Sequence, residues 1–232
     1  MIKIEWKVEN MSLEAEDMPL DIIFENEDFA IINKDAGINT HPTPGEDGRK
    51  GVRTSPSRPN SYLREPKYKA KGWDSNSPDE EYFNELIRVS KNQIIWGANH
   101  FISKIPYDSS CWVVWDKKNE GTDFADCELA WTSFKTAVRK FKWKWAGMLQ
   151  QNMSNKQQRI HPTEKPIQLY QWLLKKYAKE GDLILDTHLG SASIAIACHR
   201  EKFSLVGCEL IEEYYLAGLK RLENEQMQTT LF

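Results

Sequence analysis

The chain has 232 residues, of which 40% are hydrophobic and 11% aromatic, enough to build one sizeable core and a single domain. Its formal charge of -3 at pH 7 excludes nucleic-acid binding through overall charge, so any such binding depends on local basic clusters. No apolar run approaches the roughly 18 residues of a membrane span and the N-terminus lacks a signal-peptide core, so we expect a cytosolic protein without membrane contact.

The N-terminal part predicts a short strand and then a hairpin. Residues 1–17 alternate weakly before turning acidic, and two β-branched and aromatic runs then flank the turn at Glu25, Asn26 and Glu27. Residues 20–45 are similar to the opening of large-subunit-type pseudouridine synthases. The catalytic Arg-Leu-Asp motif of those enzymes is missing downstream, so RNA modification is not predicted.

Residues 40–77 are rich in Pro, Gly and Ser and predict a long mobile loop. The loop is strongly basic, and its positive charge suits a phosphate backbone. A loop that is merely solvated is the alternative, because basic loops are common on soluble proteins. The basic residues are Arg49, Lys50, Arg53, Arg58, Arg64, Lys67, Lys69 and Lys71.

Regular structure is expected again from Ser77. Ser77 and Pro78 predict the start of an amphipathic helix that carries Tyr82, Phe83 and Val89. Buried strands are expected at Gln93–Trp96, Cys111–Asp116 and Cys127–Trp131.

Basic and aromatic residues are interleaved from Arg139 to Trp145. In an extended strand the basic residues after Arg139 fall on one face and the aromatic residues on the other, one face packed and one available to phosphates. The basic residues are Arg139, Lys140, Lys142 and Lys144, and the aromatic residues are Phe141, Trp143 and Trp145. Core packing of the tryptophans alone would also explain the pattern. Residues 147–158 are polar and predict a loop.

The C-terminal third predicts a strand, a tight turn and a helix, followed by a second strand. The apolar run Leu183–Leu185 ends in Asp186, the turn from Gly190 to Ser193 has small residues, and the next apolar run ends in Glu209. Small turn residues let backbone amides approach a ligand, and a carboxylate about 20 residues further on can accept hydrogen bonds from ribose hydroxyls. We predict half of a nucleoside-binding α/β fold; an ordinary strand–helix connection is the alternative for this stretch alone.

Four cysteines are widely spaced and form no Cys-x-x-Cys pair, which indicates reduced core residues and no metal site. They are Cys111, Cys127, Cys198 and Cys208.

From Arg159 the text RIHPTEKPIQLYQWLLKKYAKEGDLILDTHLGSASIAIAC resembles the S-adenosylmethionine-dependent amino-methyltransferases of DNA, in circularly permuted order. Trp73–Phe101 is similar to a phage branch of this family, so the resemblance covers about Trp73 to Leu222. It implies one domain over residues 1–232 with a doubly wound, mostly parallel, seven-stranded α/β sheet of Rossmann-like type, helices on both faces and a target-recognition insertion at about 134–160. Double-stranded DNA is the implied substrate, with a homodimer or a partner methyltransferase as a further expectation.

The resemblance assigns S-adenosyl-L-methionine binding to two segments and one carboxylate. The amides at the start of the helix after Pro166 suit the cofactor's carboxylate, because a helix N-terminus favours anions. The implied cofactor-binding residues are His161, Pro162, Thr163, Lys165, Asp186, Thr187, His188, Gly190, Ser191, Ala192 and Glu209. Ala192 replaces a glycine of the family loop, which costs about 1–2 kcal/mol if that position needs a positive φ.

The catalytic motif departs from the family pattern. Asn33, Lys34, Asp35 and Ala36 stand where the family has Asp, Asn or Ser followed by Pro, Pro and an aromatic residue. Asn33 or Asp35 would orient the amino group of a flipped base, and Asn33 favours adenine-N6 over cytosine-N4. Ala36 occupies the stacking position but cannot stack, and base–aromatic stacking contributes about 1–3 kcal/mol.

Two functions therefore compete. One is a DNA adenine-N6 methyltransferase with a degenerate motif; the other is an inactive protein of the same fold that binds DNA or a partner methyltransferase. A nicotinamide-dependent dehydrogenase ranks lower, because the turn at Gly190 lacks the GxGxxG spacing.

Overall fold

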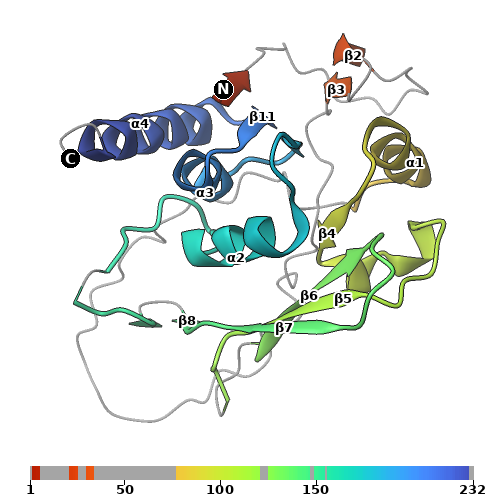
Figure 1. The fold of residues 1–232 in the computed structure, drawn as a ribbon, viewed down its shortest axis with the longest axis horizontal. Coiled ribbons are helices and arrows are strands. Elements are labelled where there is room, and N and C mark those ends of the chain that lie inside the picture. Colours follow the sequence, from red (N-terminus) through yellow and green to blue (C-terminus); the bar gives the residue numbers. More distant parts are fainter. Residues whose placement is uncertain are drawn as a thin grey trace, which may run out of the picture.

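The computed structural model describes residues 2–5, 21–25, 30–33, 77–120, 125–146, 149–154 and 156–229 (Figure 1). Within the first three ranges it describes the strands β1 (Ile2–Glu5), β2 (Asp21–Glu25) and β3 (Ala30–Asn33), and β2 pairs with β3 as an antiparallel hairpin. The short first strand and the hairpin predicted from the sequence are thus confirmed. Residues 34–76, with Lys34, Asp35, Ala36 and nearly all of the predicted basic loop, lie outside the described residues.

A parallel three-stranded sheet forms the C-terminal part, in the order β1-β11-β10. Its strands β10 (Leu183–Asp186) and β11 (Ser204–Cys208) are joined by helix α3 (Ser193–Glu201), as parallel neighbours require a crossover connection. Asp186 is in register with Gly207, so the carboxyl ends of both strands lie at one edge. Both Asp186 and Glu209 therefore belong to that edge, as the sequence predicted.

A second, four-stranded sheet has the order β4-β6-β5-β7. Its strands are β4 (Ile94–Trp96), β5 (Trp112–Asp116), β6 (Cys127–Thr132) and β7 (Arg139–Lys142). β6 is antiparallel to both β4 and β5, whereas β7 is parallel to β5. Helix α1 (Glu80–Val89) covers it through Phe83, which is fully buried in a cluster with Phe101 and Trp131.

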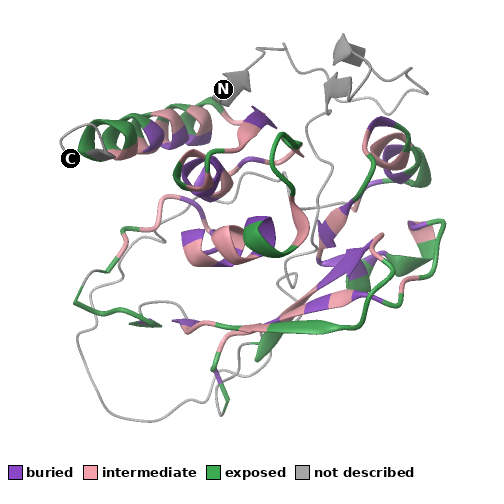
Figure 2. Ribbon diagram, in the orientation of Figure 1, coloured by how far each residue is buried: buried purple, intermediate pink, exposed green. Residues whose placement is uncertain are grey.

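Helix α2 (Ile167–Tyr177) packs between the two sheets, as Figure 1 shows. Ile167 and Leu174 belong to the core around α3 and β11, whereas Leu169 and Leu173 pack with Val113 and Trp115 of β5. Its apolar residues therefore serve two cores, and the helix ties one sheet to the other. Helix α4 (Glu212–Thr229) packs on α3 along a buried side that includes Tyr214, Gly218 and Leu222, and its other side is exposed (Figure 2).

The α/β class is confirmed, but the described strands form separate sheets rather than one sheet of seven strands. Among the described strands, β10 pairs only with β11 and β4 pairs only with β6, so each is an edge strand. The expectation of a mostly parallel sheet holds for the C-terminal sheet, whereas the other is mostly antiparallel.

Three local predictions need correction. The N-cap of α1 is Asp79, whose side chain accepts a hydrogen bond from the Tyr82 amide at 2.9 Å, rather than Ser77. The predicted loop at 147–158 contains strand β9 (Leu149–Gln150), which pairs with β8 (Trp145–Ala146). Cys127 is exposed at the start of β6, while Cys111 and Cys198 are buried as expected. Two short 3-10 helices, Ala98–His100 and Ile102–Lys104, follow β4.

The turn after β10 requires left-handed backbone at Gly190 and Ala192, both with φ of 55°. Ala192 is fully buried, and its methyl group faces Gly218 of α4 so closely that a Cβ added at Gly218 would lie 2.9 Å from it. Because its φ is positive, Ala192 carries the cost of an L-residue in the left-handed region, about 1–2 kcal/mol. Its methyl group also explains why α4 has a glycine opposite.

We predict that Gly218→Ala lowers the free energy of unfolding by about 1–3 kcal/mol through overpacking, and that Ala192→Gly in the same chain recovers most of the loss. Ala192→Gly alone relieves the left-handed strain and loses one buried methyl group, so its effect should be small or stabilising. Urea unfolding of the four proteins measures this. An equal loss of unfolding free energy for Gly218→Ala in the parent chain and in the Ala192→Gly chain would contradict this contact.

Candidate functional site

Glu209 holds the turn after β10 against the end of β11. Its Oε2 accepts a hydrogen bond from the Gly190 amide at 2.7 Å, and its Oε1 accepts one from the Ile211 amide at 2.8 Å. The Leu189 amide donates to the Cys208 carbonyl at 2.8 Å beside it. A carboxylate offers about four acceptor positions and can accept several hydrogen bonds at once.

Asp186 ends β10 and begins the same turn. Its Oδ1 accepts a hydrogen bond from the His188 amide at 2.9 Å. Burial raises the pKa of this carboxyl, and the His188 hydrogen bond and the positive charge of Lys165 only partly oppose the shift. Asp186 is therefore a carboxylate whose ionised form is costly in the folded chain.

Tyr82 of α1, the helix that packs on the four-stranded sheet, reaches this turn. Its hydroxyl lies 2.8 Å from Thr187 Oγ1 and 3.3 Å from His188 Nδ1, and its ring packs edge-on against the imidazole. Burial raises the pKa of the Tyr82 hydroxyl, which stays protonated and can donate. The contact brings β10 and the helix before β4 together.

The segment from His161 to Pro166 lies against the turn, so the structure brings together the two segments that the sequence singled out. A Cβ added at Gly190 would lie 3.7 Å from the His161 ring, which packs edge-on against Tyr214 at 4.3 Å. Thr163 Oγ1 lies 3.1 Å from His161 Nδ1. Pro166 is the N-cap residue of α2, so the first amides of the helix follow directly after this segment.

Lys165 is nearly buried in an electrostatic cluster that sequence reasoning did not find. Its Nζ lies 3.5 Å from Glu128 Oε2 and 5.5 Å from the ring centre of Trp96. Glu128 also pairs with Lys117 at 2.5 Å. Burial, and then the negative charges of Asp186, Glu128 and Glu164, raise the pKa of Tyr170 well above its ordinary value. Lys165 therefore lies beside Glu128, and its charge also acts on Asp186.

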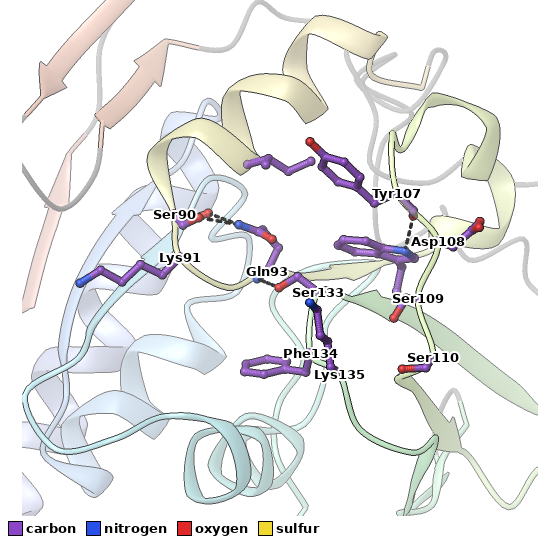
Figure 3. Close-up of a pocket in the computed structure, with 12 residues that line it drawn as sticks. Ser90, Lys91, Gln93, Tyr107, Asp108, Ser109, Ser110, Ser133, Phe134 and Lys135 are labelled. Atoms are coloured by element: carbon purple, nitrogen blue, oxygen red, sulfur yellow. Dashed lines mark hydrogen bonds between the residues drawn. The ribbon is translucent and has the colours of Figure 1, made fainter.

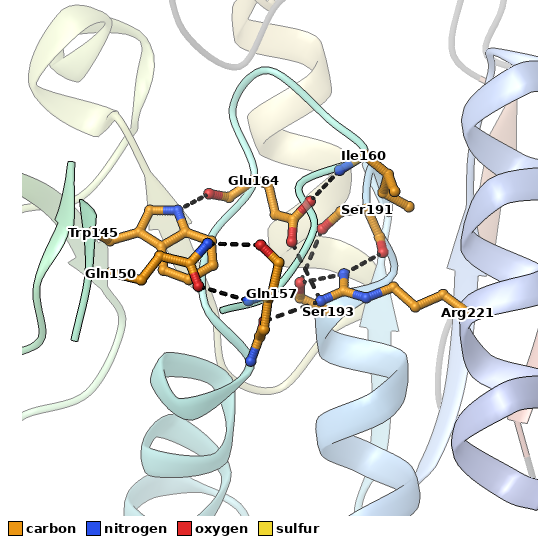
Figure 4. A network of polar contacts seen from close by, with 8 residues as sticks. All are labelled: Trp145, Gln150, Gln157, Ile160, Glu164, Ser191, Ser193 and Arg221. Carbon is orange, nitrogen blue, oxygen red and sulfur yellow. Dashed lines mark hydrogen bonds and ion pairs between the residues drawn. The ribbon is translucent and has the colours of Figure 1, made fainter. Parts of the chain in front are cut away.

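Arg221 of α4 is a residue that the sequence did not indicate. Its Nη1 donates to the Ser191 carbonyl and to Ser193 Oγ, both at 2.9 Å, and its Nη2 lies 3.3 Å from Glu164 Oε1 (Figure 4). Ser191 and Ser193 also bond to each other at 2.9 Å. Of the predicted cofactor residues, Ser191 thus points its side chain toward Ser193, and Ala192 points its methyl group toward Gly218 of α4.

The predicted nucleic-acid residues divide into two groups. Arg139, Lys140 and Lys142 of β7 are exposed and Lys144 is half-buried. Phe141 packs on Trp143 and on Trp172 of α2, so the predicted separation of a basic and an aromatic face occurs along this stretch. Lys140 lies 3.5 Å from Asp116. The other predicted residues, Arg49, Lys50, Arg53, Arg58, Lys67, Lys69 and Lys71, lie outside the described residues.

A pocket of about 470 Å³ opens elsewhere, between the end of α1 and the amino ends of β4 and β5 (Figure 3). Its lining includes Lys91, Tyr107, Trp131 and Lys135 and none of the residues predicted to bind a cofactor. Asp186 lies instead at the carboxyl end of β10, in the parallel sheet. Within the described part of the chain no three His, Cys, Asp or Glu side chains gather as metal ligands, and none of its helices is suited to cross a membrane.

Because folding raises the pKa of Asp186, this carboxyl should lower stability at neutral pH. The penalty is absent below the unfolded pKa of about 3.9, where the carboxyl is protonated in both states, and it is fully present once the pH has risen above the higher folded value. Asp186→Asn, which keeps an acceptor for the His188 amide, should therefore melt at a higher temperature at pH 7, and the difference should shrink toward pH 4.

Asp116→Asn is the matched control for this prediction. The Lys118 amide lowers the pKa of Asp116, so its substitution should shift the melting temperature at pH 7 in the opposite direction. A stability difference between the Asp186 variant and the parent chain that does not change with pH would contradict the assignment.

Residues 111–220 match the family model described as DNA methylase. The type II methyltransferase M.HpaI of Haemophilus parainfluenzae is 34% identical over 71 residues, which are 31% of this chain and 23% of the relative. The type II methyltransferase M2.DpnII of Streptococcus pneumoniae is 28% identical over 159 residues, 66% of this chain and 50% of the relative. The chain thus spans half or less of the length of these two relatives.

Among solved structures, the M1.HpyAVI–SAM complex aligns with 62% of this chain and 81% of its own, with 22% sequence identity and a TM-score of 0.46. The resemblance to the DNA methyltransferases therefore depends on the sequence matches. These matches, together with the predicted motifs at His161–Pro166 and Asp186–Ser193, confirm that the chain resembles the DNA amino-methyltransferases.

Proposed function

We propose that the chain is an S-adenosylmethionine-dependent DNA methyltransferase that modifies the N6 amino group of adenine. The observation that carries the proposal is the meeting of three features at one edge of a parallel sheet: the turn after Asp186, the Glu209 carboxylate and the segment from His161 to Pro166. Ligands of open α/β sheets bind at this carboxyl edge. The DNA methylase family match over residues 111–220 supports the same reading.

The chemistry of these residues fits the cofactor. Glu209 can accept hydrogen bonds from ribose hydroxyls, and Thr163, Lys165 and the first amides of α2 can bind a carboxylate. Asp186 supplies a negative charge, and Lys165 acts on it to favour the ionised form. A bound cationic group would favour the ionised form of Asp186 further. When bound, the cofactor supplies an electrophilic methyl group.

The target base would be flipped out of the DNA duplex, as enzymes that act on bases require. We assign Asn33, at the end of β3, to accept a hydrogen bond from the amino group of adenine, with Asp35 as the second acceptor. Ala36 leaves the stacking position without an aromatic ring. The exposed basic side chains of β7 and those predicted in residues 40–77 would bind phosphates.

A specific observation favours a second candidate, a catalytically inactive protein that binds DNA or a partner methyltransferase. The sequence Asn33-Lys34-Asp35-Ala36 lacks both prolines and the aromatic residue of the family motif. Lys34 also adds a positive charge near a cationic cofactor, which is unfavourable. This candidate predicts salt-dependent DNA binding without methyl transfer.

We further propose that the described strands belong to one doubly wound sheet. We expect β10 and β4 to be the strands through which the two sheets join. Each is an edge strand, and Tyr82, on the helix before β4, forms a hydrogen bond with Thr187 directly after β10. One additional strand between them would unite the parallel and the mixed sheet. Amide hydrogen exchange tests this: every β10 amide should be protected, whereas a true edge strand exchanges at alternate residues.

Transfer of a tritiated methyl group from S-adenosylmethionine to unmethylated DNA tests the reaction, and digestion to nucleosides identifies the product. We expect N6-methyladenine with the parent chain and a loss of at least about 100-fold with Asn33→Ala, since positioning of the amino group contributes to the rate. Cofactor affinity should stay unchanged in that variant. DNA binding without any transfer by the parent chain would instead establish the inactive candidate.

Cofactor binding itself is tested by calorimetry. Glu209→Gln keeps a carbonyl oxygen for one of the two backbone amides but replaces the other acceptor by an NH2 group and removes the charge. S-adenosylmethionine should therefore bind about 10-fold to 100-fold more weakly, as expected for hydrogen bonds to a charged group. Glu212→Ala, at an exposed residue of the first turn of α4, is the control and should bind normally. Stronger binding of NAD than of S-adenosylmethionine would overturn the cofactor assignment.

A further inference from the structure

We propose that Arg221 is a positioning residue for the cofactor, which it serves by fixing the segment around Glu164 and the turn after β10 in one relative geometry. The inference rests on the proposed function, because those two segments are the ones assigned to the cofactor. Arg221 itself lies on α4 and belongs to no motif of the sequence.

The first set of contacts reaches the turn. Arg221 Nη1 donates to the Ser191 carbonyl and to Ser193 Oγ, each at 2.9 Å. Ser191 precedes the left-handed Ala192, and Ser193 is the first residue of α3. Arg221 therefore bonds on both sides of the strained residue and holds the backbone that would approach a ligand.

The second set of contacts reaches the other segment. Arg221 Nη2 pairs with Glu164 Oε1 at 3.3 Å and donates to Gln157 Oε1 at 3.3 Å. Glu164 is itself fixed, because its Oε2 accepts from the Ile160 amide and its carbonyl accepts from Trp145 Nε1, both at 2.8 Å. Figure 4 shows the guanidinium between these groups and the serines. One side chain thus joins both predicted cofactor segments.

The ion pair between Arg221 and Glu164 is largely buried. The Glu164 side chain is fully buried and that of Arg221 is 16% exposed, so both lose much of their hydration. Burial lowers the pKa of Arg221, while the Glu164 charge raises it. Removing one partner of such a pair leaves an uncompensated buried charge. The remaining carboxylate would be expected to draw the His161–Pro166 segment away from the turn toward water.

A purely structural role, holding α4 on the core, is the competing explanation, and the chain offers a matched control for it. Arg200 of α3 pairs with Glu225 of α4 through Nε and Oε1 at 2.7 Å, and its side-chain hydrogen bonds go to Glu225 rather than to either predicted segment. Arg200→Met removes an ion pair between the same two helices. Arg221→Met removes an ion pair and the contacts to the turn.

The experiment is calorimetric titration of S-adenosylmethionine into the parent chain, Arg221→Met, Arg221→Lys, Arg200→Met and the double variant Arg221→Met with Glu164→Gln. We expect binding about 10-fold weaker in Arg221→Met, intermediate in Arg221→Lys and within about 2-fold of the parent in Arg200→Met. The double variant should bind more tightly than Arg221→Met, because it no longer contains the unpaired carboxylate. Melting temperatures measured alongside separate loss of fold from loss of affinity.

The possible failures are distinguishable. A parent chain that binds no cofactor overturns the proposed function and this inference with it. A parent chain that binds, with Arg221→Met binding equally well, overturns the inference alone. Equal loss of affinity and of melting temperature in Arg221→Met and Arg200→Met also overturns it, since the effect would then follow helix packing. Failure of Glu164→Gln to improve binding in the double variant contradicts the role of the charge.

Discussion

The hydrogen bonds from the backbone amides of Gly190 and Ile211 to the Glu209 carboxylate are the interaction on which the site depends. They fasten the turn after β10 to the end of β11, and with the Leu189 amide on the Cys208 carbonyl they fix the carboxyl edge of the parallel sheet. The His161 ring packs over Gly190, where an added Cβ would lie 3.7 Å from the ring. The site is therefore formed by backbone geometry first, and its polar side chains are arranged around it.

Two charged side chains at this edge, Asp186 and Lys165, are largely removed from water at a cost in stability. The pKa of Asp186 is raised by burial, and Lys165 is nearly buried between Glu128 and Trp96. Replacing buried ion pairs by apolar side chains is often neutral or stabilising, so a cluster of this kind is weak evidence for a role in stability. Strongly perturbed carboxyl groups gather instead where ligands bind or reactions occur.

Local patterns in the sequence predicted much of the fold. The apolar runs that end in Asp186 and Glu209 gave the two parallel strands, and the helix after Pro166 was expected from the spacing of its apolar residues. What could not be predicted is tertiary: α2 packs against both sheets, Tyr82 reaches Thr187 across the chain, and Glu128 pairs with Lys165. Arg221 lies on an ordinary amphipathic helix, and only the fold brings its guanidinium to Glu164. The resemblance alone implies a single seven-stranded sheet. Pairing between strands that are far apart in the sequence leaves no local pattern, so the sequence itself does not indicate which strands pair.

The central claim is that the segment from Arg159 to Pro166, the turn from Asp186 to Ser193 and the stretch from Glu209 to Ile211 bind one ligand together. Hydrogen exchange with and without S-adenosylmethionine, followed peptide by peptide, measures this most directly. The account predicts that amides of all three segments gain protection at the same ligand concentration, while the pocket around Trp131 is unchanged. Protection confined to one segment, or centred on that pocket, would contradict it.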